Sequence, residues 1–418
     1  MSNNNDRMGL TRRQAVAGAL VGAAASLAPR ASRAQGKPAL RIGVVNDQSG
    51  AYATGGGPGS VACVREAVRE FAAPLGLDVE VLSADHQGKP DIALAICRKW
   101  FDEGVDAAMD FQNSAVALAC TKLARERDKV ALVCNAGTSD LTGPACSPNT
   151  LHWAWDTQML ARVSGNYQVK KGNDSWFFIT ADYSFGHSLE ADATAVIKAA
   201  GGRVVGSVKM PFPTEDFSSA ILQAMSSDAK VIAMANAGDD AVTSVKQAAE
   251  FGVTKSGKVL VPMLLHLNDV HALGLQAAQG LTIPEVFYWD LNERTRAFAN
   301  RVQPHMVNQF MPNMGQAACY AAAAHYIKTA AAMGVAEAKK SGAAAVARMK
   351  AAETDDAAYG RCKIREDGRV MHTAYLMKIK SPSESKRPFD YYTVLDSVPP
   401  EQAWRPMSED NCPMVNKG

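Results

Sequence analysis

The sequence lacks a long apolar run beyond its first 34 residues. A membrane-spanning helix requires about 20 consecutive apolar residues, and no such stretch occurs in residues 35–418. The chain also lacks a CxxC pair and an HExxH motif, and its eight histidines are scattered. Zinc binding and haem attachment therefore have no support. We expect no membrane span in residues 35–418 and no metal or other cofactor.

A strong net charge is missing as well. The 44 basic and 42 acidic residues give a net charge of +2 at pH 7. Residues 1–34 hold five of the basic residues and one acidic residue, so residues 35–418 carry −2. A near-neutral chain gives no electrostatic reason to expect a nucleic acid or an anionic membrane as partner.

The N-terminus has the pattern of an export signal. Arg12 and Arg13 precede a mild, alanine-rich apolar run over 15–28, and Ser32-Arg33-Ala34 supplies a small-residue cleavage site. A twin arginine before a weakly apolar run is typical of Tat export. We expect residues 1–34 to be a Tat-type signal that directs the protein to the periplasm. A disordered tail or a transit peptide is the alternative.

The eight cysteines fall into two groups. Export permits disulfides, and Cys146 and Cys412 both lie in proline-containing loops. A bridge between these two would tie the C-terminal tail to the first lobe, and two free thiols are the alternative. Buried free thiols on predicted helices or strands are expected for four others: Cys63, Cys97, Cys120 and Cys134.

The apolar pattern predicts an α/β fold with two lobes, because 418 residues are too many for one core. Four strand–helix units open the chain, which indicates a parallel, doubly wound sheet. A second such series begins near Trp176. An aromatic strand over 151–156, with no helix directly after it, is predicted to cross into the second lobe, and 280–289 to return. About three crossings form the hinge.

This pattern gives expected domain boundaries. Residues 1–34 are the signal, 35–153 plus 288–354 form lobe 1, and 154–287 plus 355–390 form lobe 2. Residues 391–418 form a tail that returns to the hinge or to lobe 1.

Polar loops follow several predicted strands, and ligands of open α/β sheets bind beyond the carboxyl ends of strands. The clearest loop is Asp182-Tyr-Ser-Phe-Gly186, which follows the apolar strand from Trp176. It offers a carboxylate at Asp182, a phenol, and an aromatic wall at Phe185. The competing interpretation is that such loops only cap helices.

Several segments together resemble the type I periplasmic solute-binding proteins that serve ABC importers of the branched-chain amino acid type. They are Asp47-Gln48-Ser49-Gly50 with Tyr52, Asn113-Ser114, Ala136-Gly137-Thr138, Asp182–Gly186, Asn268–Gly274 and Arg365–Arg369. The resemblance covers essentially all of residues 35–418. It implies a protein without catalytic activity that closes two lobes on a small molecule and presents it to a membrane permease. We expect a monomer.

The resemblance also implies site residues. Ser114, Ala136 and Thr138 match the positions that bind the ligand carboxylate, and Phe185 matches an aromatic cover. A glutamate that takes the ligand ammonium in amino-acid binders is missing from 262–267. A small organic, keto or aromatic acid is therefore a better guess than an amino acid, although Asp182, Asp239 or Asp240 could still supply a carboxylate.

Other strand-end residues complete the predicted ligand site. They are Tyr52, Asn113, Gly137, Asn236 and His266. A structural role is the competing interpretation for His266. Trp153 and Trp155 are expected to pack the hinge.

Three other functions are weaker alternatives. Gly57–Ala62 fits GxGxxA, so a Tat-exported NAD(P)-dependent oxidoreductase is the main rival. However, these glycines lie about a dozen residues after the strand, and Pro58 interrupts the loop. Ser184 resembles a nucleophile elbow without its first glycine. A ligand-sensing partner of a signalling receptor would have the same fold.

Overall fold

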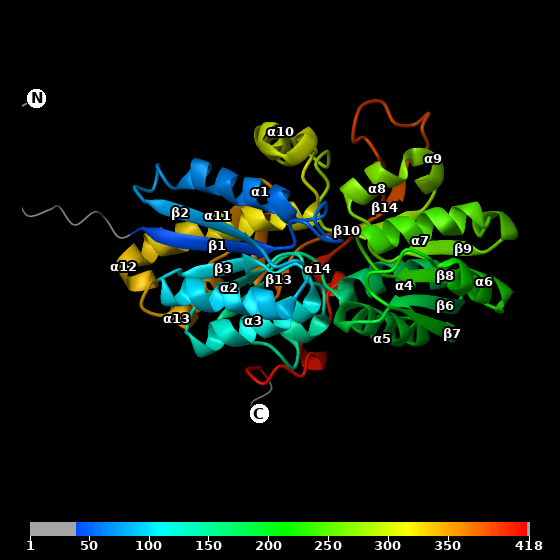
Figure 1. The fold of residues 1–418 in the computed structure, drawn as a ribbon, viewed down its shortest axis with the longest axis horizontal. Coiled ribbons are helices and arrows are strands. Elements are labelled where there is room, and N and C mark those ends of the chain that lie inside the picture. Colours follow the sequence, from blue (N-terminus) through cyan, green and yellow to red (C-terminus); the bar gives the residue numbers. More distant parts are fainter. Residues whose placement is uncertain (1–38, 416–418) are drawn as a thin grey trace, which may run out of the picture. The chain divides into compact units, whose positions relative to one another are not determined.

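The computed structural model describes residues 39–415, so the expected export signal lies outside the described residues. Two parallel β-sheets form the framework (Figure 1). The first has the strand order β2-β1-β3-β4-β5 and the second β7-β6-β8-β9. The strands are β1 Leu40–Asn46, β2 Val79–Asp85, β3 Ala107–Asp110, β4 Val130–Val133, β5 Thr150–His152, β6 Ser175–Ala181, β7 Arg203–Met210, β8 Val231–Ala235 and β9 Val259–Pro262.

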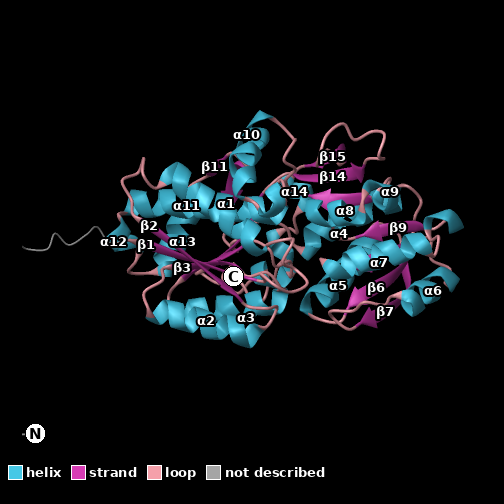
Figure 2. Ribbon diagram, turned by 45° about the horizontal axis from the view of Figure 1, so that its top comes forward, coloured by secondary structure: helices cyan, strands magenta, loops and turns pink. Residues whose placement is uncertain are grey.

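Helices cover both faces of each sheet. Around the first sheet, α1 and α11 lie on one face and α2 and α3 on the other (Figures 1 and 2). Every residue of the inner strands β3, β4, β6 and β8 is buried, as strands covered on both faces require. The edge strand β7 alternates instead. The helices are α1 Gly57–Phe71, α2 Pro90–Asp102, α3 Ser114–Glu126, α4 Thr157–Lys170, α5 Ser184–Ala199, α6 Ser218–Ser226, α7 Asp239–Glu250, α8 Leu267–Leu273, α9 Leu275–Ala278, α10 Glu293–Val302, α11 Met314–Met333, α12 Val335–Ala338, α13 Gly342–Lys350 and α14 Pro400–Ala403.

The expected α/β class with two parallel-sheet lobes is confirmed. We call the first sheet with its helices lobe 1 and the second sheet with its helices lobe 2. No helix among residues 39–415 is long and apolar enough to cross a membrane.

The first crossing differs from the prediction. The expected aromatic strand over 151–156 is a short strand, β5, that pairs in parallel with β4 at the edge of the first sheet. Helix α4 follows it directly, although no helix was expected there. Asp156 caps this helix by accepting a hydrogen bond from the Met159 N–H at 2.7 Å. Tryptophans before the cap hid the helix start, because they favour strand.

Two small antiparallel sheets use segments that are distant in the sequence. One pairs β10 (Thr282–Glu285), β14 (Ala374–Ile379) and β15 (Tyr392–Val398), and it packs on α4 of lobe 2. The other joins β11 (Thr354–Asp356), β12 (Gly360–Ile364) and β13 (Val370–Met371) beside α11 and α13 of lobe 1. The expected boundaries after residues 354 and 390 therefore cut through these sheets.

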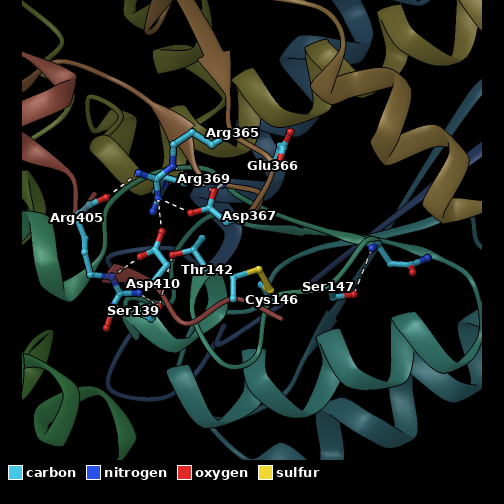
Figure 3. Close-up of a disulfide and its surroundings, with 12 residues drawn as sticks. Ser139, Thr142, Cys146, Ser147, Arg365, Glu366, Asp367, Arg369, Arg405 and Asp410 are labelled. Atoms are coloured by element: carbon cyan, nitrogen blue, oxygen red, sulfur yellow. Dashed lines mark hydrogen bonds and ion pairs between the residues drawn. A yellow bond between two sulfur atoms is a disulfide. The ribbon is translucent and has the colours of Figure 1, made fainter. Parts of the chain in front are cut away.

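The C-terminal tail is fastened to lobe 1. A disulfide joins Cys146 and Cys412, whose Cα atoms are 5.7 Å apart. Asp410 accepts hydrogen bonds from Arg365, at 2.8 Å, and from Arg405 (Figure 3). Arg405 also donates to the Ser139 carbonyl at 3.1 Å. The bridge considered from the sequence is thus present. Cys63, Cys97, Cys120 and Cys134 are buried free thiols, as expected.

The Gly57–Ala62 segment is not a phosphate-binding loop. It forms the first turns of α1, which begins at Gly57 with Pro58 in its first turn. A Cβ atom at Gly59 would lie 2.3 Å from the Gln316 amide nitrogen on α11. Gly59 therefore allows α1 to pack closely on α11, which explains this glycine without a nucleotide.

Candidate functional site

A small cavity lies between the strand-end loops of the two lobes. In the part of the chain that the structure describes, no aspartate, glutamate, lysine or arginine lines it. Four of the lining residues are Tyr or Phe or Trp, and most others are small or carry amides. The lining residues are Tyr52, Gly55, Gln112, Asn113, Ser114, Asn135, Ala136, Gly137, Trp155, Tyr183, Phe185, Ala237, Gly238, Leu264 and His266.

Seven of the ten predicted ligand-binding residues lie on this wall. They are Tyr52, Asn113, Ser114, Ala136, Gly137, Phe185 and His266. The structure thus brings together loops that are more than 200 residues apart. Their roles toward a ligand remain predictions.

Three predicted residues do not reach the wall. The Thr138 hydroxyl bonds the Ser188 hydroxyl at 2.8 Å. Asp182 is about half exposed and lies 2.7 Å from the His187 imidazole. The Asn236 amide donates to the Asp240 carbonyl at 3.3 Å. In each case the side chain is engaged with another residue of the protein.

Eight lining residues are not among the ten predicted ligand-binding residues: Gly55, Gln112, Asn135, Trp155, Tyr183, Ala237, Gly238 and Leu264. Gln112, Asn135 and Tyr183 each adjoin a predicted residue, so complete strand-end loops would have found them. Trp155 was expected to pack the hinge. It reaches the cavity because a Cβ atom at Gly137 would lie 2.0 Å from its ring, so only glycine leaves that space.

The loop after β3 has an unusual backbone. Asp110, Phe111 and Asn113 all have positive φ angles, of 82°, 53° and 97°. Non-glycine residues avoid this region, and such strain persists only where neighbouring contacts hold it. Here the Asn113 side chain caps α3 by accepting from the Ala115 N–H at 2.9 Å. The Gln112 amide donates to the Tyr52 carbonyl at 2.7 Å.

A buried carboxyl group anchors this loop from behind. Asp110 accepts hydrogen bonds from the side-chain amides of Asn46, at 2.8 Å, and Asn135, at 2.6 Å. Burial raises the pKa of Asp110, and the two amides oppose that rise. The amides thereby hold the ends of β1, β3 and β4 in one arrangement.

Lobe 1 offers several hydrogen-bond donors without a partner. Among the described residues, the backbone N–H groups of Ser114, Ala136 and Gly137 make no hydrogen bond. The Ser114 hydroxyl oxygen accepts from the Thr138 N–H at 3.1 Å, so its own hydrogen can be donated. The Trp155 indole N–H is buried and unpaired. Buried N–H groups are almost always paired, so this concentration indicates a binding site for an acceptor.

Lobe 2 supplies most of the aromatic wall. Phe185 packs edge-on against Trp155, with ring centroids 5.7 Å apart. Phe212 stacks on Tyr183 at 4.8 Å and on Tyr52 of lobe 1 at 5.1 Å. The hydroxyl groups of Tyr52 and Tyr183 bond one another. These rings connect the lobes beside the cavity.

Gly238 allows the lobes to touch. Its φ is +60°, and a Cβ atom there would lie 2.4 Å from the Ala51 carbonyl oxygen. The neighbouring Asp239 N–H donates to that same oxygen at 3.2 Å. Only glycine fits the conformation and the spacing at this contact.

His266 is the one imidazole on the wall. It lies near Gly55, where a Cβ atom would be 3.0 Å from its ring, and its centroid is 6.0 Å from that of Trp155. Its Nδ1 atom is buried without a partner. Burial lowers the pKa of His266 to about 4, so the ring is neutral at pH 7.

Comparisons with known proteins agree with this architecture. A family model described as "Periplasmic binding protein" matches residues 39–386. A periplasmic binding protein from Burkholderia mallei is 40% identical, with a TM-score of 0.85 over 90% of this chain and 99% of that chain. A branched chain amino acid ABC transporter periplasmic ligand-binding protein from Burkholderia xenovorans LB400 is 36% identical, with a TM-score of 0.79 over the same shares.

A curated relative matches over a shorter range. Leu/Ile/Val-binding protein homolog 6 of Brucella melitensis is 27% identical over 249 residues, which are 58% of this chain and 63% of that protein. The match thus spans less than two thirds of its length. Two lobes around a cavity define the class of solute-binding proteins with the type I fold, and the expected resemblance is confirmed. The chain belongs to the periplasmic binding protein family.

Proposed function

We propose that this protein is the periplasmic substrate-binding component of an ABC importer and that it captures a small carboxylate-bearing solute. An organic, keto or aromatic acid fits better than a branched-chain amino acid. The proposal includes export by the twin-arginine signal, delivery to a permease in the inner membrane, action as a monomer, and neither catalysis nor a cofactor.

One observation carries the ligand class: an uncharged cavity with a surplus of hydrogen-bond donors on lobe 1. The unpaired N–H groups of Ser114, Ala136 and Gly137 belong to residues that line the cavity. Ser114 also begins α3, where the helix dipole favours an anion. A carboxylate would accept from these N–H groups and from the Ser114 hydroxyl. Thr138 would act indirectly, because its N–H orients that hydroxyl.

The absence of an acidic lining residue argues against α-amino acids. A buried ammonium group needs a negative partner, and none of the residues that line the cavity is acidic. Asp182 is half exposed. The Asp240 carboxylate accepts the Thr214 N–H at 3.1 Å, and neither Asp239 nor Asp240 lines the cavity.

The aromatic wall favours a flat or apolar remainder of the ligand. Tyr52, Trp155, Tyr183 and Phe185 provide it. Two solute-binding proteins of Rhodopseudomonas palustris with this fold were solved with benzoate and with 4-hydroxybenzoate. Because they are only 22% and 21% identical, this likeness concerns the fold, and our argument for the ligand rests on the cavity.

We propose closure of the lobes as the mechanism. The Thr138–Ser188 bond, the Tyr52–Tyr183 bond and the contact of Asp239 with Ala51 all join lobe 1 to lobe 2. A ligand held by both walls would favour the state in which these contacts form, and the permease would recognise that state. We place residues 354–371 in lobe 1 and 374–398 in lobe 2, with the tail fastened back to lobe 1.

A thermal-shift screen of residues 35–418 tests the function. The ligands are small carboxylates, each with its neutral amide, together with branched-chain amino acids, NAD and NADP. A ligand at 100 times its dissociation constant stabilises a protein by about 2.7 kcal/mol. We expect carboxylates to raise the melting temperature and their amides to do so far less. A rise only with NAD or NADP, or only with amino acids, would contradict the proposal.

A further inference from the structure

The cavity offers neutral hydrogen-bond donors to a carboxylate but no positive charge to balance it. Enclosing an ionised carboxylate without a positive partner is costly. None of the residues that line the cavity is a lysine or an arginine. Neutral donors of lobe 1 stabilise the anion but leave its charge uncompensated. A group that can become positive on ligand binding would complete the site.

His266 is the lining group that can do so. His266 is 5% exposed, and it borders the cavity. The Nδ1 atom of its imidazole has no hydrogen-bond partner among the described residues. Within residues 39–415, no carboxylate forms an ion pair with the imidazole. Its backbone N–H donates to the Asp269 carboxylate at 2.8 Å, which holds the residue at the start of α8. The backbone of His266 is therefore held at the start of α8, and the Nδ1 atom of its imidazole has no hydrogen-bond partner among residues 39–415.

We infer that capture of a carboxylate by this protein is coupled to uptake of one proton, which His266 holds while the ligand is bound. The inference rests on the proposed carboxylate site and adds a partner for the charge. A nearby anion favours the charged form of an imidazole. Its Nδ1–H or Nε2–H would then donate to the ligand. Affinity should therefore rise as the pH falls.

Other titratable groups surround His266, and the test must separate them. Asp269 lies behind it, and burial raises the pKa of Asp269 to about 7. Asp239 raises that pKa further, and Asp269 in turn acts on buried Glu285. Across the cavity, Tyr52 and Tyr183 have pKa values raised by burial. Because Asp269 titrates near neutrality, a pH-dependent affinity alone would not identify the histidine.

The experiment counts protons. Benzoate is titrated into the purified protein by calorimetry at about pH 6 to 8, where a free carboxylic acid is ionised. Each titration is repeated in buffers with different ionisation enthalpies. We expect uptake of close to one proton per benzoate, and an affinity that falls about tenfold for each unit rise in pH. In His266→Gln, uptake should fall to near zero and the affinity should lose its pH dependence.

The matched control is His271→Gln. His271 lies on α8, where its imidazole contacts the Tyr391 hydroxyl at 2.7 Å outside the cavity. This variant should behave as wild type. If His266→Gln fails to fold, the imidazole NMR signals of the wild type, with and without benzoate, report the protonation directly.

Each other outcome counts against the inference. Binding of benzoate without proton uptake overturns it and leaves the proposed function standing. Uptake that persists in His266→Gln also overturns it, because the proton then sits on the ligand or on Asp269. If benzoate binds at no pH, the proposed aromatic-acid ligand fails, and the inference fails with it.

Discussion

The two walls of the cavity differ in what they offer a ligand. Lobe 1 presents unpaired N–H groups, a serine hydroxyl and amide side chains on a strained loop after β3. Lobe 2 presents Tyr183, Phe185, Leu264 and a single neutral imidazole. Under the proposed function, lobe 1 supplies the hydrogen-bond donors for the charged end of the ligand, and lobe 2 supplies most of the apolar cover together with the His266 imidazole. A ligand that needs both would link them.

The largest expected effect is on the free energy of unfolding, and it concerns the disulfide that ties the C-terminal tail to lobe 1. The tail leaves β15 and α14 beside lobe 2 and is bridged to Cys146 of lobe 1. We expect Cys146→Ser with Cys412→Ser to destabilise the protein by about 2–5 kcal/mol, because 266 residues separate the two cysteines. Chemical denaturation measures this. A reductant should lower the stability of the wild type but leave the double variant unchanged. Equal loss in both would contradict the account.

The next effect tests the polar wall. Ser114→Ala removes the hydroxyl that accepts from Thr138 and faces the cavity. We expect carboxylate affinity to fall about 10- to 100-fold, since an unsatisfied buried group costs about 1–3 kcal/mol. Affinity for the neutral amide should change far less. Ser164→Ala on α4, which is equally buried and has no hydrogen-bond partner, is the control. If Ser114→Ala lowered the affinity for the acid and for its amide equally, the lobe 1 wall would not be the part that recognises the carboxylate.

A third effect distinguishes the carboxyl groups behind the two walls. Asp110 has two amide donors, whereas burial raises the pKa of Asp269 to about 7. A raised carboxyl pKa means that the folded state binds the extra proton. Its contribution to stability is therefore complete below about pH 4 and is lost as the pH rises towards 7. We expect Asp269→Asn to reduce the difference in stability between pH 5 and pH 8 by about 2–3 kcal/mol, because two pH units lie between pH 5 and the raised pKa.

Melting temperatures at pH 5 and pH 8 measure that change. Asp269→Asn should be favoured over the wild type more at pH 8 than at pH 5. Asp182→Asn provides the control, because the Asp182 carboxylate is half exposed. An unchanged pH dependence in Asp269→Asn would show that Asp269 is ionised in the folded protein near pH 5.

The smallest effect tests the contact between the walls. Tyr52→Phe and Tyr183→Phe each remove one partner of the hydroxyl pair. A hydrogen bond contributes about 0.5–1.5 kcal/mol, so either variant should weaken binding about two- to tenfold. If the pair acts as one unit, the double variant should lose no more than either single variant. Fully additive losses would contradict the interlobe bond.

Much of this architecture follows from sequence pattern. Buried strands such as β4 and β8 are short apolar runs, the kind of pattern from which the two parallel sheets were expected. The pairing of β10 with β14 was not predicted, because about 90 residues separate the two strands and no local pattern encodes it. Helix α4 was missed because its cap follows two tryptophans that favour strand.

For the site, the sequence predicted which loops surround the cavity better than it predicted which side chains face it. Asp182 and Phe185 belong to one loop, yet only Phe185 faces the cavity, because the start of α5 turns alternate residues in different directions. The Asn236 side-chain amide donates hydrogen bonds to Asp240 and Ser244 of α7 and so does not face the cavity. Trp155 reaches the wall only because Gly137, which lies in the preceding strand-end loop, leaves space for its ring. Such outcomes depend on packing between loops.

The most direct test is a crystal structure with the carboxylic acid that gives the largest thermal shift. The account predicts carboxylate oxygens within hydrogen-bonding distance of the Ser114 hydroxyl and the Gly137 N–H, with the rest of the ligand against Phe185 and Trp155. A carboxylate bound by the lobe 2 wall alone, or outside this cavity, would contradict the account.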